Sequence, residues 1–146
     1  MLRALLVELH PPHLAAEGLE AALTDLVSPL GARGVRVSVA LDGAEALGRE
    51  TQALVYRVAR EAIRNVIAYA NAESVRIELA VAGPVARLVV VDDGDGFDPA
   101  LRELRQAEGH LGLSLVEELV REGGGTITIS SGEGAGTRVE LEVPAR

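Results

Sequence analysis

Apolar positions follow two different periods along the 146-residue chain, and the period changes from one segment to the next. Leucines recur every three or four residues over residues 2–9 and 14–30, and the longest such stripe runs through residues 50–70. This spacing places apolar side chains on one face of a helix, so it predicts helices over these segments and over residues 111–122. Prolines or glycines follow the first, second and last of these segments, which is typical of helix ends.

Five other segments alternate between apolar and polar residues, which is the period of a half-buried β-strand. Residues 93–110 lack a firm period and are rich in Gly, Asp and charged residues, so they predict a mobile loop with room for a short helix. With 48% hydrophobic and only 2% aromatic residues, the core must consist of Val, Leu, Ile and Ala. The pattern predicts one α/β (α+β) domain in which helices cover one face of a sheet. The predicted strands are residues 35–41, 74–81, 85–92, 126–130 and 137–143.

The charge balance and the absence of cysteine exclude several kinds of site. A net charge of -8 argues against a nucleic-acid surface, because neutralising phosphates needs clustered Lys and Arg in excess. The lack of cysteine excludes disulfides and thiolate metal sites and favours a reducing compartment. No apolar run reaches the roughly 20 residues that span a bilayer, and residues 1–9 contain Glu8 and no cleavage site. We therefore expect a cytoplasmic domain without nucleic-acid partners or direct membrane contact.

A polar pair lies beside the apolar stripe of the segment 50–70. Glu61 and Asn65 are four residues apart, which stacks them on one face of a helix. The amide oxygen of Asn65 could coordinate Mg²⁺, and the carboxylate of Glu61 could orient or deprotonate a water or hydroxyl group. On spacing alone such a pair is more often a surface feature, so its meaning depends on the motifs that follow.

Glycine-rich motifs follow at three places. Asp92 ends an apolar strand and begins the run DDGDG, where a carboxylate can accept a hydrogen bond from an exocyclic amine and Gly94 and Gly96 let the backbone approach a flat ring. The alternative there is a turn with Asp as turn former. The run GHLGL, residues 109–113, precedes a helix whose N-terminal N–H groups favour phosphate, although an ordinary loop-to-helix junction looks the same. The run GAGT, residues 134–137, opens the last strand and also fits a bulged hairpin turn.

In this order the motifs resemble the four boxes of the gyrase, Hsp90, histidine kinase and MutL ATPase superfamily. EAIRN resembles the N box, and DDGDG, GHLGL and GAGT resemble the first, second and third glycine boxes. Within the superfamily the chain is similar to the catalytic domains of nitrate-sensor and DesK-like histidine kinases, whose opening pattern resembles LRALLVELHPPHL followed by GLEAAL. The resemblance covers essentially the whole chain. It implies a Bergerat ATP-binding fold, a two-layer sandwich of a mixed β-sheet with helices on one face.

The resemblance also implies a role for the residues of each box. Asn65 would hold Mg²⁺, Asp92 would bind the adenine amine, and residues 109–113 would close on the phosphates. Glu61 matches the acidic residue of the N box and is the candidate catalytic base. The implied nucleotide-binding residues are Asn65, Tyr69, Asp92, Gly94, Gly96, Phe97, Gly109, His110, Leu111, Gly112, Leu113, Gly136 and Thr137.

A protein histidine kinase is the activity that the resemblance implies. Such a domain binds ATP with Mg²⁺ and donates the γ-phosphate to a histidine on a separate dimerisation domain, which in turn serves a response regulator. Residues 1–12 would be the end of a dimerisation-domain helix and its linker, and residues 13–146 would be the catalytic domain. Family acceptors have an acidic residue directly after the histidine, whereas His10, His13 and His110 are each followed by proline or leucine.

One position departs from the family pattern and keeps alternatives open. Relatives usually carry Lys or Arg three residues after the N-box Asn and His or Tyr one residue later, but this chain has Ala68 and Tyr69. Arg102 or Arg105 could supply the missing cation, although solvated charges are commoner in such a loop. A non-catalytic nucleotide-sensing module is therefore one alternative. Another is an anti-sigma-factor serine kinase, which ordinarily begins on a strand, whereas this sequence begins with a helical pattern.

Overall fold

A computed structural model describes residues 18–67, 71–94, 112–131 and 136–146. Its elements are α3 (Leu19–Ala32), β1 (Arg36–Asp42), η1 (Ala44–Ala46), α4 (Arg49–Asn65), β2 (Ser74–Ala82), β3 (Val85–Asp92), α6 (Gly112–Glu122), β4 (Thr126–Ser131) and β5 (Thr137–Pro144). The strands form one sheet with the order β1-β2-β3-β5-β4. The sheet is mixed, because β1 is parallel to β2 and the other neighbouring pairs are antiparallel.

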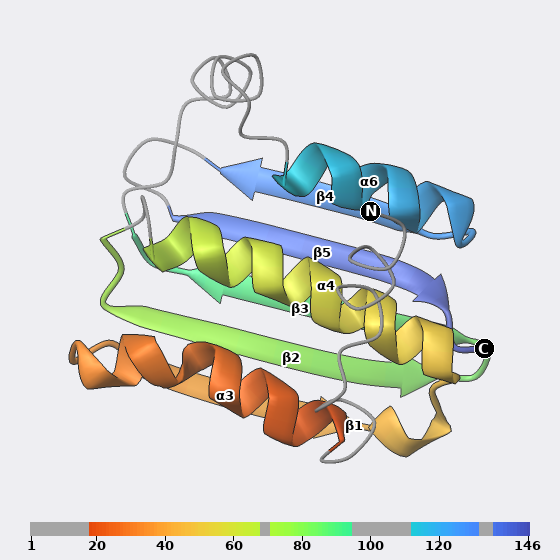
Figure 1. The fold of residues 1–146 in the computed structure, drawn as a ribbon, viewed down its shortest axis with the longest axis horizontal. Helices are drawn as coiled ribbons and strands as arrows, with labels where there is room; N and C mark the ends of the chain where they lie inside the picture. Colours follow the sequence, from red (N-terminus) through yellow and green to blue (C-terminus); the bar gives the residue numbers. More distant parts are fainter. Residues whose placement is uncertain (1–17, 68–70, 95–111, 132–135) are drawn as a thin grey trace, which may run out of the picture.

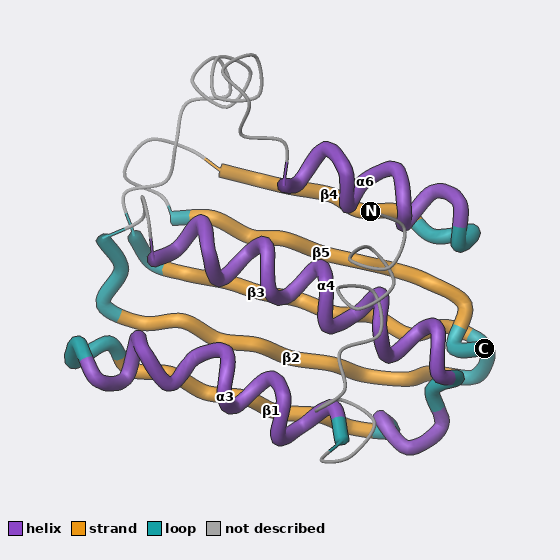
Figure 2. The backbone as a smooth tube through the Cα atoms, in the orientation of Figure 1, coloured by secondary structure: helices purple, strands orange, loops and turns teal. Residues whose placement is uncertain are grey.

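The helices α3, α4 and α6 lie side by side on one face of the sheet and leave the other face open (Figure 1, Figure 2). This arrangement confirms the predicted two-layer α/β (α+β) architecture, and each strand agrees with its predicted range to within one residue at either end. Within the part of the chain that the structure describes, no helix is long and apolar enough to cross a membrane.

The predicted helix over residues 50–70 differs from the structure in its last part. The α-helix ends at Asn65, Val66 and Ile67 take a π-helical conformation, and residues 68–70 lie outside the described residues. The apolar stripe predicts a helical segment without distinguishing an α-turn from a π-turn. The short helix η1 was not predicted, because three residues are too few to show a period.

The core lies between the inner face of the sheet and the three helices. Side chains from all layers are fully buried there, with Leu23 on α3, Ile63 on α4, Val120 on α6, and Ile77 and Leu88 on the central strands. Burying an aliphatic side chain of this size stabilises the fold by about 1.5 to 3 kcal/mol. The core therefore holds the ends of the central strands and of α4 in fixed positions.

The open face of the sheet carries charge pairs beside apolar side chains such as Val85 and Val89. Arg87 on β3 donates hydrogen bonds to Glu140 on β5, and Arg138 donates to the same carboxylate at 3.0 Å. These two guanidinium groups, chiefly that of Arg87, hold the pKa of Glu140 below its usual value. The alternation along each strand thus keeps this face in water while the inner face packs on the helices.

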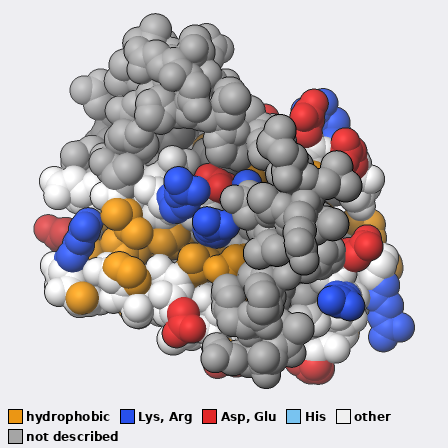
Figure 3. Space-filling view, in the orientation of Figure 1, with side chains coloured by type: hydrophobic (Ala, Val, Ile, Leu, Met, Phe, Trp, Pro, Cys, Tyr) orange, Lys and Arg blue, Asp and Glu red, His pale blue; other side chains and the backbone are white. Residues whose placement is uncertain are grey.

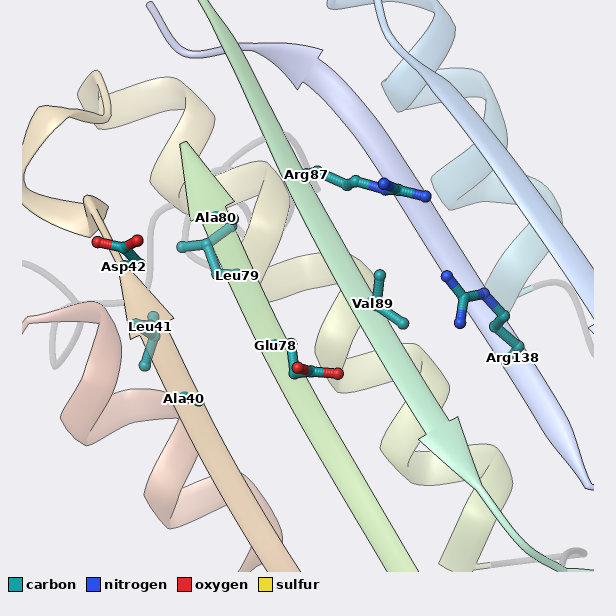
Figure 4. A pocket seen from close by; sticks show the side chains of 9 residues that line it. All are labelled: Ala40, Leu41, Asp42, Glu78, Leu79, Ala80, Arg87, Val89 and Arg138. Carbon is teal, nitrogen blue, oxygen red and sulfur yellow. The ribbon is translucent and has the colours of Figure 1, made fainter. Parts of the chain in front are cut away.

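A shallow hollow of about 380 Å³ lies on the open face. The small side chains of Ala40 and Ala80 leave room between the larger residues Glu78, Arg87 and Arg138 (Figure 4). Its lining carries charges of both signs, and the sheet separates it from the helices. The hollow is therefore separate from the cluster of polar residues at the ends of the strands, which lies on the helix side of the sheet.

Candidate functional site

Four segments that are far apart in the sequence meet at one end of the molecule. The helix α4 and the strand β3 end there, and α6 and β5 begin there, at the left ends of these elements in Figure 1. The pairing of β3 with β5 brings Asp92 directly opposite Thr137. Residues from all four predicted boxes therefore approach the same place.

Asp92 is a buried carboxylate at the last position of β3. Its side chain points inward, as those of Leu88 and Val90 do, and the residue is only 6% exposed. The N–H of Gly94 donates to its Oδ1 at 2.8 Å, and the backbone N–H of Thr137 also donates to the carboxylate. Burial raises the pKa of Asp92 above its ordinary value, although these two hydrogen bonds act in the opposite direction. A carboxylate has more acceptor positions than two N–H groups occupy, so it can still accept from a ligand.

Gly136 lies against the backbone of Asp92. Its φ is 76°, and a Cβ at this position would lie 2.2 Å from the carbonyl oxygen of Asp92. No side chain fits at that distance, and the left-handed backbone also favours glycine. Thr137, the last residue of the GAGT run, begins β5, which pairs with β4, and residues 134 and 135 lie outside the described residues. Gly136 allows β5 to approach β3 closely beside the buried carboxylate.

Asp93 joins the end of β3 to the start of β2, a link that the sequence patterns did not predict. Its Oδ1 accepts hydrogen bonds from the N–H groups of Glu73 and Ser74 at 2.9 and 2.8 Å, and its Oδ2 accepts one from the Ser74 hydroxyl at 2.9 Å. The backbone and side chain of Ser74 are the main cause of a lowered pKa of Asp93. Asp93 thereby fixes the chain directly after Asp92. The only signal in the sequence was a second aspartate behind the strand.

Glu61 is buried on α4 between two arginines of the same helix. Its Oε1 lies 3.8 Å from Nη2 of Arg57 and 3.6 Å from Nη1 of Arg64. Arg57 is buried as well, whereas the side chain of Arg64 is 64% exposed. A buried carboxylate is costly unless a cation accompanies it, so Arg57 offsets the desolvation of Glu61. The helical period did not predict this buried pair, because it registers only apolar residues.

Asn65 lies one turn beyond Glu61, as the last residue of α4, and is partly buried. Gly112 and Leu113 form the start of α6 at the same end of the molecule. The remaining predicted nucleotide-binding residues lie outside the described residues, and they are Tyr69, Gly96, Phe97, Gly109, His110 and Leu111. His10, His13, Ala68, Arg102 and Arg105 lie outside them as well.

The described residues fit an adenine nucleotide. The buried carboxylate of Asp92 can accept a hydrogen bond from the N–H of a base, and the missing side chain at Gly136 lets the backbone of β5 lie close beside it. The amide oxygen of Asn65 is a suitable ligand for a hard cation such as Mg²⁺. A mixed sheet covered on one face by helices, with these groups at one end, is compatible with a nucleotide-binding domain of the ATPase type.

Comparison with known protein families identifies the family to which the chain belongs. Residues 50–146 match the family of histidine kinase-, DNA gyrase B-, and HSP90-like ATPases. The match spans more than half of the chain, and the chain belongs to this family.

Two curated relatives are sensor kinases. The chain is 30% identical over 144 residues to the sensor histidine kinase LiaS of Bacillus subtilis, an alignment that covers 98% of the chain and 39% of LiaS. It is 29% identical over 148 residues to an uncharacterized sensor-like histidine kinase of Chloroflexus aurantiacus, with 97% of the chain and 25% of that protein covered. The chain therefore spans between a quarter and two fifths of the length of these relatives.

Solved structures of histidine kinases share the fold. The histidine kinase domain of the blue-light activated histidine kinase from Erythrobacter litoralis has a TM-score of 0.68 at 22% identity, over 87% of this chain and 59% of that chain. The mycobacterial sensor histidine kinase MprB has a TM-score of 0.62 at 18% identity, over 86% of this chain and 93% of that chain. At these identities the likeness concerns the fold alone, and it confirms the predicted mixed sheet covered by helices.

Proposed function

We propose that the chain is the ATP-binding catalytic domain of a two-component sensor histidine kinase of the nitrate-sensor and DesK-like type. It would bind Mg-ATP and donate the γ-phosphate to a histidine on a dimerisation domain that serves a response regulator in the cytoplasm. Residues 13–146 would form the catalytic domain, and residues 1–12 the end of the dimerisation-domain helix and its linker. The buried Asp92 beside Gly136, in a chain of this ATPase family, is the observation that carries the proposal.

Each described residue of the site would have a separate task. Asp92 would accept a hydrogen bond from the adenine amine, and Asn65 would contribute an oxygen ligand to Mg²⁺. Glu61 would act as the base toward the acceptor histidine, with Arg57 keeping its charge in place inside the protein. Bound ATP would supply the phosphoryl group that is transferred.

Removing the amide of Asn65 is expected to abolish the contribution of Mg²⁺ to nucleotide binding. Asn65→Ala should bind ATP in EDTA as the wild type does, but it should gain little affinity when Mg²⁺ is added, because the metal is shared between protein and phosphates. Calorimetric titrations with and without Mg²⁺ measure the ATP affinity in EDTA and the gain in affinity from the metal. Gln52→Ala removes an amide from the first turns of α4, at the opposite end of the helix, and serves as the control. An equal gain from Mg²⁺ in Asn65→Ala and wild type would show that Asn65 is not a ligand.

The chain alone is expected not to phosphorylate itself, but to phosphorylate a cognate dimerisation domain supplied in trans. None of its three histidines has the acidic neighbour of family acceptors, and phosphoryl transfer needs an acceptor placed nearly in line. Incubation with γ-labelled ATP should give an acid-labile, alkali-stable label on the dimerisation domain only. A stoichiometric alkali-stable label on the chain alone would refute this prediction.

The same labelling experiment separates the two alternative functions. ATP binding without transfer to any dimerisation domain would favour the nucleotide-sensing module. An acid-stable label on a serine of a partner protein would favour the anti-sigma-factor serine kinase.

A further inference from the structure

The end of the molecule that carries the candidate site is rich in negative charge. Glu61, Asp92 and Asp93 belong to it, and the C-terminal end of α4 adds the partial negative charge of a helix dipole. The whole chain has a net charge of -8. A triphosphate would be repelled by this environment unless the bound Mg²⁺ and cationic side chains of the protein offset the negative charge. The sequence contains no lysine, so arginine is the cationic side chain available for the purpose.

Arg64 is an exposed cation that precedes the predicted metal ligand in the sequence and lies 3.6 Å from Glu61. It lies in the last turn of α4, next to Asn65, and 64% of its side chain is exposed. Figure 3 shows that positively charged side chains reach the surface on the helix-covered face, beside a patch of apolar ones. A guanidinium group can bind two phosphate oxygens at once, which makes arginine well suited to this ligand.

The other arginines of α4 are less well placed. Arg49 is the first residue of the helix and lies at its opposite end. Arg57 is buried beside Glu61. Arg60 lies one turn before Arg64 and is only partly exposed. Among the described residues of this helix, Arg64 alone combines exposure with a position beside Asn65.

The contact of Arg64 with Glu61 is weak, so replacing it by a contact with a ligand would cost little stability. The separation of 3.6 Å is too long for a hydrogen bond, and an ion pair with one exposed member adds little to stability. Glu61 would keep Arg57 as its second cation if Arg64 moved away. Arg64 therefore lies near Glu61 of the candidate site without a strong ion pair that would prevent it from binding a ligand.

We propose that Arg64 binds the triphosphate of ATP and leaves Glu61 to do so. This inference rests on the proposed function, since it assigns a residue to the same site. The position of Ala68, where relatives of the family carry Lys or Arg, follows Arg64 by four residues. Arg64 would supply the cation that the family pattern places at residue 68.

Binding of ATP, ADP and AMP to Arg64→Gln tests the proposal by calorimetry. The variant should lose about tenfold in affinity for Mg-ATP, because a charge-assisted contact is removed, and almost nothing for AMP, which has only the α-phosphate. Arg60→Gln makes the same change of charge one turn earlier and should keep the affinity for both nucleotides. Ala68→Lys in the Arg64→Gln background should restore part of the lost preference for ATP over AMP.

The outcomes separate this inference from the proposed function on which it rests. If wild type prefers ATP to AMP and Arg64→Gln keeps the whole preference, the inference is overturned and the proposed function stands. An equal loss of ATP affinity in Arg64→Gln and Arg60→Gln also overturns it, since a general charge effect then explains the loss. Thermal unfolding of each variant without nucleotide shows whether it is folded. A wild-type chain that binds no adenine nucleotide would overturn the proposed function and the inference together.

Discussion

Asp92→Asn is expected to weaken ATP binding by about 1 to 3 kcal/mol, while the unliganded domain keeps or gains stability at neutral pH. Binding suffers because the amide offers fewer acceptor positions to the adenine amine in a site that is largely closed to water. Stability does not suffer, because the asparagine oxygen can still accept the N–H of Gly94 and the removal of a buried charge offsets any weakening of the hydrogen bond from Thr137. A loss of affinity without a loss of stability would mark Asp92 as a binding residue.

The raised pKa of Asp92 determines how the difference in stability between wild type and Asp92→Asn changes with pH. Folding favours the protonated carboxyl group, so its contribution to stability is fully present below the pKa of the unfolded chain. That contribution is lost as the pH rises through the higher pKa of the folded state. The free energy of unfolding of wild type should therefore fall relative to that of Asp92→Asn over this range. Urea denaturation at several pH values between strongly acidic and neutral measures the difference.

Asp42→Asn is the matched control for both measurements. Asp42 is the last residue of β1, as Asp92 is the last residue of β3, but it is exposed and lies two strands away from β3. This variant should keep the ATP affinity of wild type. If Asp42→Asn and Asp92→Asn bound ATP equally well, the adenine contact would have to be assigned to another residue.

The alternation of side chains predicted the strands, and the same period explains the inward direction of Asp92. Asp92 has the same parity as Ala86, Leu88 and Val90 on β3, so the period that buries these residues also turns its carboxylate toward the helices. The alternation in the sequence matches the alternation of buried and exposed side chains in the structure, because helices cover only one face of the sheet. The assignment of an adenine contact to Asp92 came from the resemblance of the four boxes and stays a prediction.

The contacts that hold the site together could not be predicted from local patterns. Asp93 accepts hydrogen bonds from residues 19 and 20 positions earlier in the chain, and these meet only when β2 and β3 pair. The pairing of Glu61 with buried Arg57 depends on how much of the polar flank of α4 the tertiary structure covers. Sequence periods carry no information about the Asp93 contacts, because these arise from the packing of separate strands. The spacing of Arg57 and Glu61 on one helix allows the pair, but it does not show that the pair is buried.

Gly136→Ala is expected to destabilise the domain by about 2 to 5 kcal/mol and to abolish ATP binding. A left-handed backbone costs an alanine about 1 to 2 kcal/mol, and forcing a methyl group into a filled space costs about 1 to 3 kcal/mol more. The new Cβ would meet the carbonyl oxygen of Asp92 at 2.2 Å, and its next contacts are also backbone atoms. Relief requires β5 to move away from β3, which would remove the hydrogen bond from Thr137 to the Asp92 carboxylate.

Gly34→Ala separates the two costs. Gly34 has a φ of 85°, close to that of Gly136, but a Cβ at this exposed position meets nothing within 4 Å. Its alanine variant should lose only the backbone term, about 1 to 2 kcal/mol, and should bind ATP as wild type does. Urea denaturation gives the two free energies of unfolding, and the shift of the melting temperature with added Mg-ATP reports binding in each protein. If both variants lost the same free energy of unfolding and Gly136→Ala still responded to Mg-ATP, the close contact between Gly136 and the backbone of Asp92 would be refuted.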